Sequence, residues 1–292
     1  MPNNALHEPV LVKEILAGLG PVAHLNSSVK IIDATLGTGG HSLAFVTAGY
    51  QVLGIEADVN MLNIAKARLS DNAKLINGNF KDIDRFAREN NFFQVDAIIF
   101  DLGVSNIQLT DLTRGFSFGN PDAALDMRLD VVNQSLTAAD LLNVLRPDQL
   151  EQLFKRVLKP WVAGKLSQEI VRVRAAAKFN TVGDFIRVCT VVSAKPGLNQ
   201  ATLPFLALRI AVNSELENLQ EGLPKALELV RSGGRILIIY FHSKEKEIVM
   251  NFVKRNKNNM RLITLTPIGP GNEEIKTNPR ARSARLVILE KI

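Results

Sequence analysis

The chain has 292 residues, of which 46% are hydrophobic and 22% charged, a balance that excludes a disordered chain and a disulfide-stapled scaffold. Its 35 lysines and arginines exceed its 29 aspartates and glutamates, and the resulting charge of +6 is compatible with a nucleic-acid partner without requiring one. There is neither a signal-peptide pattern at the N-terminus nor a run of about 18 apolar residues that would span a membrane. We therefore expect a cytoplasmic protein with no membrane partner.

Strand-like and helix-like segments alternate over the first third of the chain. Asp58 is a plausible N-cap, and the apolar residues after it recur at helical spacing. The run that ends at Asp101 is almost entirely apolar, as expected for a strand buried on both faces. The alternation predicts a parallel sheet covered by helices, with strands at Val29–Asp33, Gln51–Glu56, Lys74–Asn77 and Val95–Asp101 and helices at Ser42–Ala48, Asp58–Leu69 and Asp82–Asn90.

The alternation stops near Thr110 and gives way to helical patterns, which predict helices at Thr137–Val144, Asp148–Leu158, Gly164–Lys178 and Val182–Val192. The single cysteine, Cys189, lies in this part, in an apolar run. One cysteine forms neither an internal disulfide nor a zinc cluster, so we interpret it as a buried structural thiol rather than a reactive one.

The strand–helix alternation returns towards the C-terminus. The pattern predicts, in order, a long helix over Phe205–Leu229 broken near Gly222–Pro224, a turn at Ser232–Gly234, a strand at Arg235–Tyr240, a helix at Ser243–Val253 and strands at Arg261–Thr266 and Ala284–Leu289. Pro267 and Gly269–Gly271 predict an exposed loop between the last two strands. We therefore expect a discontinuous α/β domain, 1–110 and 205–292, interrupted by a helical substrate-binding domain, 111–204.

A glycine-rich loop, Gly37-Thr-Gly-Gly-His-Ser42, follows the first strand. A nicotinamide-binding fingerprint needs a third glycine, and this chain has Ser42 there. A phosphate-binding P-loop needs Gly-Lys-Ser/Thr, and the loop contains no lysine. Both phosphate-binding interpretations therefore fail on the residues present.

Acidic residues end the neighbouring strands, at Asp33, Glu56 and Asp101. Open parallel sheets bind ligands at the carboxyl ends of their strands, where an acidic side chain can accept hydrogen bonds from ribose hydroxyls. A ligand with a ribose and no phosphate fits this arrangement, and S-adenosylmethionine is such a ligand. The alternative is that the glycines serve only a tight turn.

Several stretches, in the same order along the chain, resemble motifs of the MraW/RsmH family of bacterial and organellar 16S rRNA N4-cytidine methyltransferases. The similarity runs from His7 to Leu286 and is weakest in the helical segment. The motifs are "HEPVLVKEIL", "DATLGTGGH", "GNF", "DLGVSNIQL", "RGFSF", "LDMRLD", "ALRIAVNSELENL", "GGRILIIYFHS" and "NPRARSARL".

The resemblance implies a Rossmann-like class I S-adenosylmethionine-dependent methyltransferase fold with an inserted helical domain. It also implies a target cytidine in the decoding region of small-subunit rRNA, presented as the RNA or as the assembled small subunit. Glu56 stands where the family usually has aspartate, and its extra methylene should still reach the ribose. Transferred motif by motif, the cofactor-binding residues are Gly39, Gly40, His41, Glu56, Phe80, Asp101 and Gln108.

The implied chemistry requires neither a metal nor a covalent nucleophile, because the sulfonium methyl group is already activated. The lone pair of the exocyclic amine is delocalised into the cytosine ring, so the enzyme must hold N4 in line with the methyl group and place an acceptor on its N–H. Asp101 is expected to contact the cofactor, to orient this amine, or both. His242 is the second catalytic candidate, with a plain capping role as the alternative.

The residues expected to bind the RNA substrate are Arg114, Arg128, Arg209, Asn213, Arg280 and Arg282. The helical segment adds a run from Lys155 to Lys178 with seven basic residues and one acid, Glu169, for which a solvated helix face is the alternative. Trp161 could stack on a base, but a single tryptophan in a helical domain is more often part of the core.

The sequence departs from the family pattern in four places on or near the substrate side: Lys155–Lys159, Leu198–Leu203, Tyr240–Glu247 and Asn106. The cofactor motifs are intact. We expect an rRNA (cytosine-N4)-methyltransferase. The alternatives are a non-catalytic RNA-binding or ribosome-assembly factor that retains the donor pocket, and a methyltransferase with another nucleic-acid substrate.

Overall fold

The computed structural model describes residues 9–20, 29–192, 197 and 199–292. The chain divides into two compact units, which we call the sheet unit (Met1–Gly103 with Leu216–Ile292) and the helical unit (Val104–Glu215). The helical unit contains the whole of the expected insertion, 111–204. His7 and Leu198, named above with the motifs, lie outside the described residues. Among the helices that the structure describes, none is long and apolar enough to cross a membrane.

The sheet unit is built on a seven-stranded sheet with the order β3-β2-β1-β4-β5-β7-β6. The first five strands in chain order pair in parallel, whereas β7 is antiparallel to both of its neighbours. The mostly parallel sheet predicted from the sequence is therefore confirmed. The strands are β1 (Lys30–Asp33), β2 (Gln51–Glu56), β3 (Lys74–Asn77), β4 (Val95–Asp101), β5 (Val230–Tyr240), β6 (Met260–Leu262) and β7 (Arg285–Lys291).

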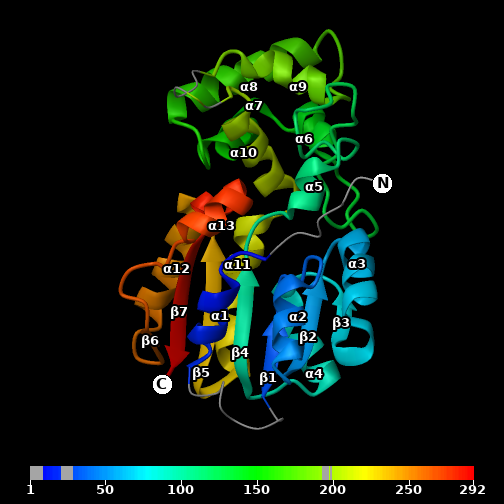
Figure 1. The fold of residues 1–292 in the computed structure, drawn as a ribbon. Helices are drawn as coiled ribbons and strands as arrows, with labels where there is room; N and C mark the ends of the chain where they lie inside the picture. The colour runs from blue at the N-terminus through cyan, green and yellow to red at the C-terminus, as the bar shows by residue number, and fades with distance from the viewer. Residues whose placement is uncertain (1–8, 21–28, 193–196, 198) are drawn as a thin grey trace. The chain divides into compact units, whose positions relative to one another are not determined.

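Helices cover both faces of this sheet (Figure 1). Successive strand residues point to opposite faces, so Ile31 packs in the cluster that contains α1 and α2, whereas Ile32 packs in the cluster that contains α4, α11 and α12. The first face carries α1 (Val12–Gly18), α2 (Gly40–Thr47) and α3 (Val59–Leu69), and the second carries α4 (Ile83–Asn90), α11 (Glu215–Leu229) and α12 (Ser243–Arg255). Short 3-10 turns follow α3 (η2, Ser70–Asn72) and β3 (η3, Phe80–Asp82).

The helical unit has its own core, in which the rings of Phe154, Phe185 and Phe205 pack together. Thr137 and Thr181 begin two of its helices, because each forms a capping box with an aspartate three residues later. Cys189 is buried, and burial raises the pKa of its thiol, which confirms the structural interpretation. The helices are α5 (Asn106–Thr110), α6 (Ala138–Val144), α7 (Pro147–Lys155), α8 (Pro160–Arg174), α9 (Val182–Cys189) and α10 (Thr202–Val212).

The predicted break near Gly222–Pro224 is wrong. The chain breaks instead between α10 and α11, where Ser214 adopts a left-handed φ of 50°, and Pro224 lies inside α11. Gly222 reflects packing rather than a helix end, because an added Cβ would lie 3.0 Å from the ring of Phe80. The sequence pattern therefore predicted the helix boundary at the wrong residue.

Two further predictions near the C-terminus need correction. The expected turn at Ser232–Gly234 is a bulge inside β5, whose pairing moves from Val95–Val230 to Ala97–Arg235. The expected loop before β7 contains a helix, α13 (Asn272–Thr277), and a 3-10 turn, η4 (Pro279–Ser283). Buried Ala281 and the Glu274 side chain, which accepts a hydrogen bond from the Leu11 N–H, fasten this segment to the sheet unit.

Candidate functional site

Three acidic residues meet at one edge of the sheet. Asp33, Glu56 and Asp101 end β1, β2 and β4, and β1 lies between β2 and β4 in the sheet. Because these strands are parallel, their carboxyl ends lie at the same edge. The order of the strands reverses at β1, which is the place where open α/β sheets bind their ligands. The expected gathering of acidic side chains is therefore present.

The glycine loop joins β1 to α2 in a tight backbone turn. Gly39 is the N-cap of α2 with a φ of 79°, and an added Cβ would lie 3.0 Å from Leu69. At Gly40 an added Cβ would lie 2.9 Å from Pro9. Both glycines therefore have packing reasons, as in the tight-turn alternative. Gly37 differs, because its φ is 53° and an added Cβ meets only the Thr35 carbonyl oxygen, at 4.0 Å, so one side of its backbone is open.

Glu56 fastens the two loops that follow β1 and β2. Its Oε2 accepts a hydrogen bond from the Gly37 N–H at 2.7 Å, and its Oε1 accepts one from the Asp58 N–H at 2.8 Å. Burial raises the pKa of Glu56 to about 7. Each carboxylate oxygen has two lone pairs, so one acceptor site on each remains for a ligand.

Both carboxylate oxygens of Asp33 accept hydrogen bonds from the protein itself. Its side chain is 1% exposed, and its Oδ2 accepts a hydrogen bond from the Ser42 hydroxyl at 2.7 Å. Burial raises its pKa to about 6. Ser42, which replaces the third glycine of a nicotinamide fingerprint, thus ties α2 to the end of β1. Of these two acids, Glu56 is therefore the one that keeps acceptor sites open to a ligand.

Asp101 is the exception among the three acids, because one of its oxygens has no partner. Its backbone N–H donates to the Thr35 hydroxyl at 2.6 Å, whereas the buried Oδ1 accepts no hydrogen bond from any residue that the structure describes. Burial, with the nearby charges of Asp33 and Glu245, raises the pKa of Asp101 to about 8. A buried acceptor left open is costly, so this atom is a candidate for binding a ligand.

His41 lies beside Asp101 but is engaged elsewhere. Its Nε2 is 2.8 Å from the Val10 carbonyl oxygen, which can only accept, so Nε2 carries the proton. Its Nδ1 is 3.9 Å from Asp101 Oδ2, too far for a hydrogen bond. The side chain is only 5% exposed. The ring therefore forms part of the wall behind Asp101 and holds the segment before α1 against α2.

His242 has the geometry of its capping alternative. It is the N-cap of α12, where its Nδ1 accepts a hydrogen bond from the Glu245 N–H at 3.3 Å. Its buried Nε2 lies 3.2 Å from Glu245 Oε1 without the geometry of a hydrogen bond. Glu245 in turn accepts from the Phe241 N–H at 2.8 Å. A capping box therefore fixes the chain after β5, and a catalytic role for His242 stays a prediction.

The two remaining cofactor candidates lie in different units. Phe80 begins η3 after β3, and its ring packs edge-on against Phe100 of β4 with centroids 5.5 Å apart. Gln108 belongs to the helical unit, where its side chain accepts from the Ser105 N–H at 2.8 Å and completes the capping box of α5. Phe80 thus supplies an apolar wall at the carboxyl edge of the sheet, and the observed role of Gln108 is to begin a helix.

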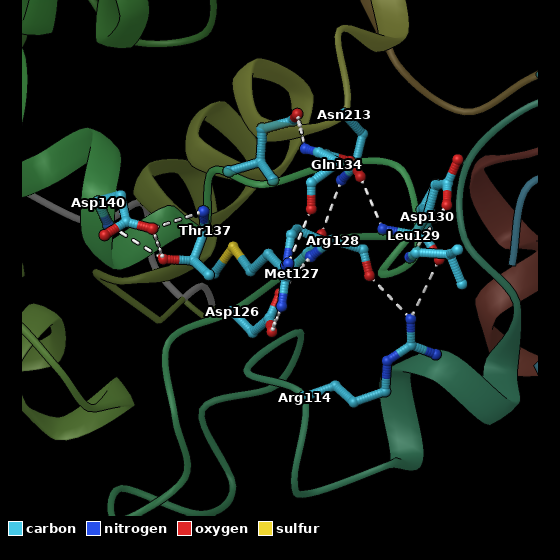
Figure 2. A network of polar contacts seen from close by, with 12 residues as sticks. Arg114, Asp126, Met127, Arg128, Leu129, Asp130, Gln134, Thr137, Asp140 and Asn213 are labelled. Carbon is cyan, nitrogen blue, oxygen red and sulfur yellow. Dashed lines mark hydrogen bonds and ion pairs between the residues drawn. The ribbon is translucent and has the colours of Figure 1, made fainter.

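Three of the expected RNA-binding residues form a polar network inside the helical unit (Figure 2). Arg128 forms a bidentate ion pair with Asp126, through hydrogen bonds of 2.7 and 2.8 Å, and donates a third hydrogen bond to the Gln134 carbonyl. Arg114 donates to the Arg128 carbonyl at 2.8 Å. Asn213 accepts from the Leu129 N–H and donates to the Met127 carbonyl, each at 2.8 Å. These side chains hold the "LDMRLD" segment, in which Met127 has a left-handed φ of 62°.

The other three expected RNA-binding residues divide into one that is paired and two that are exposed. Arg209 contacts Glu215 through two hydrogen bonds, at 2.8 and 2.9 Å, and is 15% exposed. Arg280 and Arg282 lie on the exposed side of η4 in the sheet unit, with buried Ala281 between them. Their RNA contacts stay predictions, with the exposed pair the more accessible to a phosphate backbone.

Trp161 corrects one interpretation of the sequence. Its side chain is 55% exposed on α8, so assigning it to the core is wrong. The reason is its place on the helix, because the neighbouring positions, Val162 and Ala163, face the core instead. Glu245 was not predicted, although the spacing His-x-x-Glu at a helix start is a capping-box signal that identifies it.

The chain is similar to known methyltransferases over almost its whole length. A family model described as the MraW methylase family matches residues 4–292. Three relatives carry the name ribosomal RNA small subunit methyltransferase H. That of Methylacidiphilum infernorum is 39% identical, over 98% of this chain and 94% of the relative. The proteins of Dictyoglomus thermophilum and Thermomicrobium roseum are both 38% identical, over 98% and 100% of this chain and 97% and 95% of their own lengths.

Proposed function

The chain belongs to the MraW methylase family, and from this premise we propose that it transfers a methyl group from S-adenosylmethionine to the exocyclic N4 of a cytidine in small-subunit ribosomal RNA. Its sheet order, with β7 antiparallel between β5 and β6, is that of class I S-adenosylmethionine-dependent methyltransferases. The observation that carries the proposal is the buried, unpartnered Oδ1 of Asp101 at the carboxyl edge of this sheet.

The residues at this edge fit a ligand that combines a ribose with a positive charge. Glu56 keeps an acceptor site on each oxygen, and the open side of Gly37 lets a ligand approach the backbone. Burial raises the pKa values of Glu56 and Asp101 to about 7 and 8, and a cation placed beside them would favour their charged forms. Donor binding should therefore release protons.

When bound, S-adenosylmethionine supplies a sulfonium methyl group that is already activated for transfer. The protein must then position the amine, and Asp101 has the open acceptor for one of its N–H groups. A hydrogen bond to Asp101 draws the amine out of conjugation with the cytosine ring, so that its lone pair can turn towards the methyl group. The ionised form of Asp101 accepts this hydrogen bond, and the carboxylate can take the proton that N4 loses.

The same edge provides a wall for the reacting groups. The capping box of His242 and Glu245 fixes the backbone after β5, next to the end of β4. At Gly103 an added Cβ would lie 3.6 Å from the Phe241 ring, so this ring lies close to the "DLGVS" turn. We propose that Phe241 and His242 line the place of the target base. Arg280 and Arg282 would contact the RNA backbone, and the reaction would take place in the cytoplasm, where small subunits are assembled.

The direct test uses purified protein, methyl-labelled donor and small subunits that lack the modification. The proposal expects label in N4-methylcytidine when the RNA is digested and its nucleosides are separated by mass. Asp101→Asn serves as the matched control, because it keeps the size of the side chain and removes its charge. Donor binding without label on any RNA would contradict the proposal in favour of a non-catalytic RNA-binding protein. Label on DNA alone would favour another nucleic-acid substrate.

A further inference from the structure

The outer face of α8 carries a row of four exposed side chains, Trp161, Lys165, Gln168 and Arg172, which we call the α8 stripe. Successive members are three or four residues apart, so they lie on one side of the helix. From the first to the last they cover about 16 Å along the helix axis. The opposite side of α8 is buried in the core of the helical unit through Val162, Ala163, Leu166, Ser167 and Ile170.

Trp161 is the large exposed side chain at the start of the α8 stripe. It is 55% exposed, and the Lys165 ammonium lies 5.3 Å from the centroid of its ring. This cation–π contact limits the motion of both side chains and places a positive charge beside a flat apolar ring. A ring with a cation next to it is the pairing with which proteins hold an unpaired base and its phosphate.

The positive charge along the α8 stripe is largely available. Lys165, and Lys159 just before α8, are exposed and form no ion pair with any residue in the described ranges. Arg172 is 72% exposed, but it donates two hydrogen bonds to Glu169, through Nε at 2.8 Å and through Nη2 at 2.5 Å. In contrast, Arg174 of the same helix donates to two carbonyl groups of the unit, those of Leu142 and Leu145.

We propose that the α8 stripe is a docking surface for an unpaired segment of RNA, with one base stacked on Trp161 and the backbone phosphates beside Lys159 and Lys165. This inference rests on the proposed function, because it takes the occupant to be part of the ribosomal RNA substrate. Charge complementarity favours RNA as the occupant, because the stripe and Lys159 carry three cations and one flanking acid, Glu169. Stacking on an aromatic ring is tolerant of base identity, so the stripe adds affinity without selecting the target cytidine.

Trp161 is the only tryptophan in the chain, so the intrinsic fluorescence of the protein reports directly on this position. The experiment titrates the full chain with a single-stranded RNA of about twelve nucleotides, with the matching RNA duplex and with heparin as a polyanion without bases. The single strand should quench the tryptophan emission strongly, whereas the duplex and heparin should leave most of it. Equal quenching by heparin, or no quenching by an RNA that binds, would overturn the proposal.

Point variants then show which side chains contribute to RNA affinity, which is measured by the fluorescence anisotropy of a labelled single strand. Trp161→Ala should weaken binding about tenfold, as expected for the loss of one stacked base, whereas Trp161→Phe should keep most of the affinity. Phe93→Ala is the matched control, because Phe93 is 47% exposed in the sheet unit and should not affect binding. Lys165→Ala should reduce the slope of log affinity against log salt by about one, and Lys254→Ala by much less.

The outcomes separate this inference from the proposed function. Selective quenching and a loss of affinity in Trp161→Ala, with no methyl transfer to small subunits, would support the α8 stripe and contradict the proposed function. Methyl transfer with an unchanged KM in Trp161→Ala, and no quenching, would overturn the stripe alone. Weaker binding of Trp161→Ala to small subunits without any response to free RNA would also overturn it, in favour of a ribosomal protein as partner.

Discussion

The acidic residues at the carboxyl edge of the sheet and those of the helical unit differ in the direction in which their pKa values are shifted. At the carboxyl edge of the sheet, burial raises the pKa values of Asp33, Glu56 and Asp101. In the helical unit, hydrogen bonds and arginine partners lower the pKa values of acids such as Asp126 and Asp184. The acids at the edge of the sheet are buried without a positively charged partner among the described residues, whereas those of the helical unit are paired within their own unit.

This difference indicates what the charges of each unit do. A buried acid with a raised pKa lowers the stability of the fold at neutral pH, so it is expected where a ligand requires it. The paired acids of the helical unit stabilise their own loops and helix starts, and their arginine partners are occupied by the same contacts. The proposed RNA binding by the helical unit therefore depends on cations outside this network, such as Lys159 and Lys165.

The largest expected effect comes from Asp101→Asn. The change removes the carboxylate that we propose accepts the hydrogen bond of the amine, so methyl transfer should fall at least about a hundredfold. Labelled transfer to unmethylated small subunits measures this rate, with the donor at saturation. A variant that keeps more than a tenth of the wild-type rate would show that the open acceptor is not used in the reaction.

Glu56→Gln should act on donor binding rather than on transfer. The amide keeps one acceptor oxygen but loses the charge, and its NH2 group faces one of the two backbone N–H donors, of Gly37 or Asp58. The affinity for S-adenosylmethionine should fall about tenfold or more, in line with the loss of a charge-assisted hydrogen bond. Calorimetry in buffers of different ionisation enthalpy measures both this affinity and the proton release. Unchanged affinity and unchanged proton release would remove Glu56 from the donor site.

Asn213→Ala tests whether the polar network of the helical unit is structural. It leaves the Leu129 N–H and the Met127 carbonyl without their partners, so the unit should lose about 2 kcal/mol of stability. Denaturant unfolding measures the loss, and donor affinity should be unchanged. Full stability together with a large loss of RNA affinity would instead make Asn213 a direct substrate contact.

A smaller effect is expected from Arg282→Ala. Arg282 is exposed on η4, and one lost phosphate contact should weaken RNA binding only a few-fold and reduce the salt dependence by about one unit. The affinity for small subunits at two or more salt concentrations measures both quantities. The same charge removed at Arg255, at the exposed end of α12, provides the control. Equal effects of the two variants would indicate a general response to net charge.

The sheet and its acidic edge were predictable from the sequence because they depend on local signals. Each strand is a short apolar run, and the residues that end the strands, such as Glu56 and Asp101, must meet because the strands are parallel. The N-cap at Asp58 was predictable for the same reason, since the cap and the helix it begins are adjacent in the chain. The open acceptor on Asp101 was not, because the absence of a partner depends on every neighbour in the fold.

Two features of the helical unit and its end could not be predicted from local sequence patterns. Asn213 bonds to backbone groups that lie more than 80 positions away along the chain, so no local pattern shows that it is a structural residue. The break at Ser214 has no glycine or proline to signal it, whereas Gly222 and Pro224 signalled a break that does not exist. The glycine at position 222 instead reflects long-range packing against Phe80.

We infer that the fold keeps Asp101 buried, with its Oδ1 unpartnered, at a cost in stability. The folded chain retains protons that the unfolded chain has released, because burial raises the pKa of Asp33 to about 6, of Glu56 to about 7 and of Asp101 to about 8, from ordinary values near 4. Stability without ligand should therefore fall as the pH rises from about 5 to 8.

The most direct measurement compares the unfolding temperatures of the wild type and Asp101→Asn across this pH range. The variant has no carboxylate to ionise at this position, so it should lose less stability as the pH rises. At pH 8 it should unfold several degrees above the wild type, at about 2–4 °C per kcal/mol for a chain of this size. A variant that is less stable at every pH, with the same slope as the wild type, would contradict the claim.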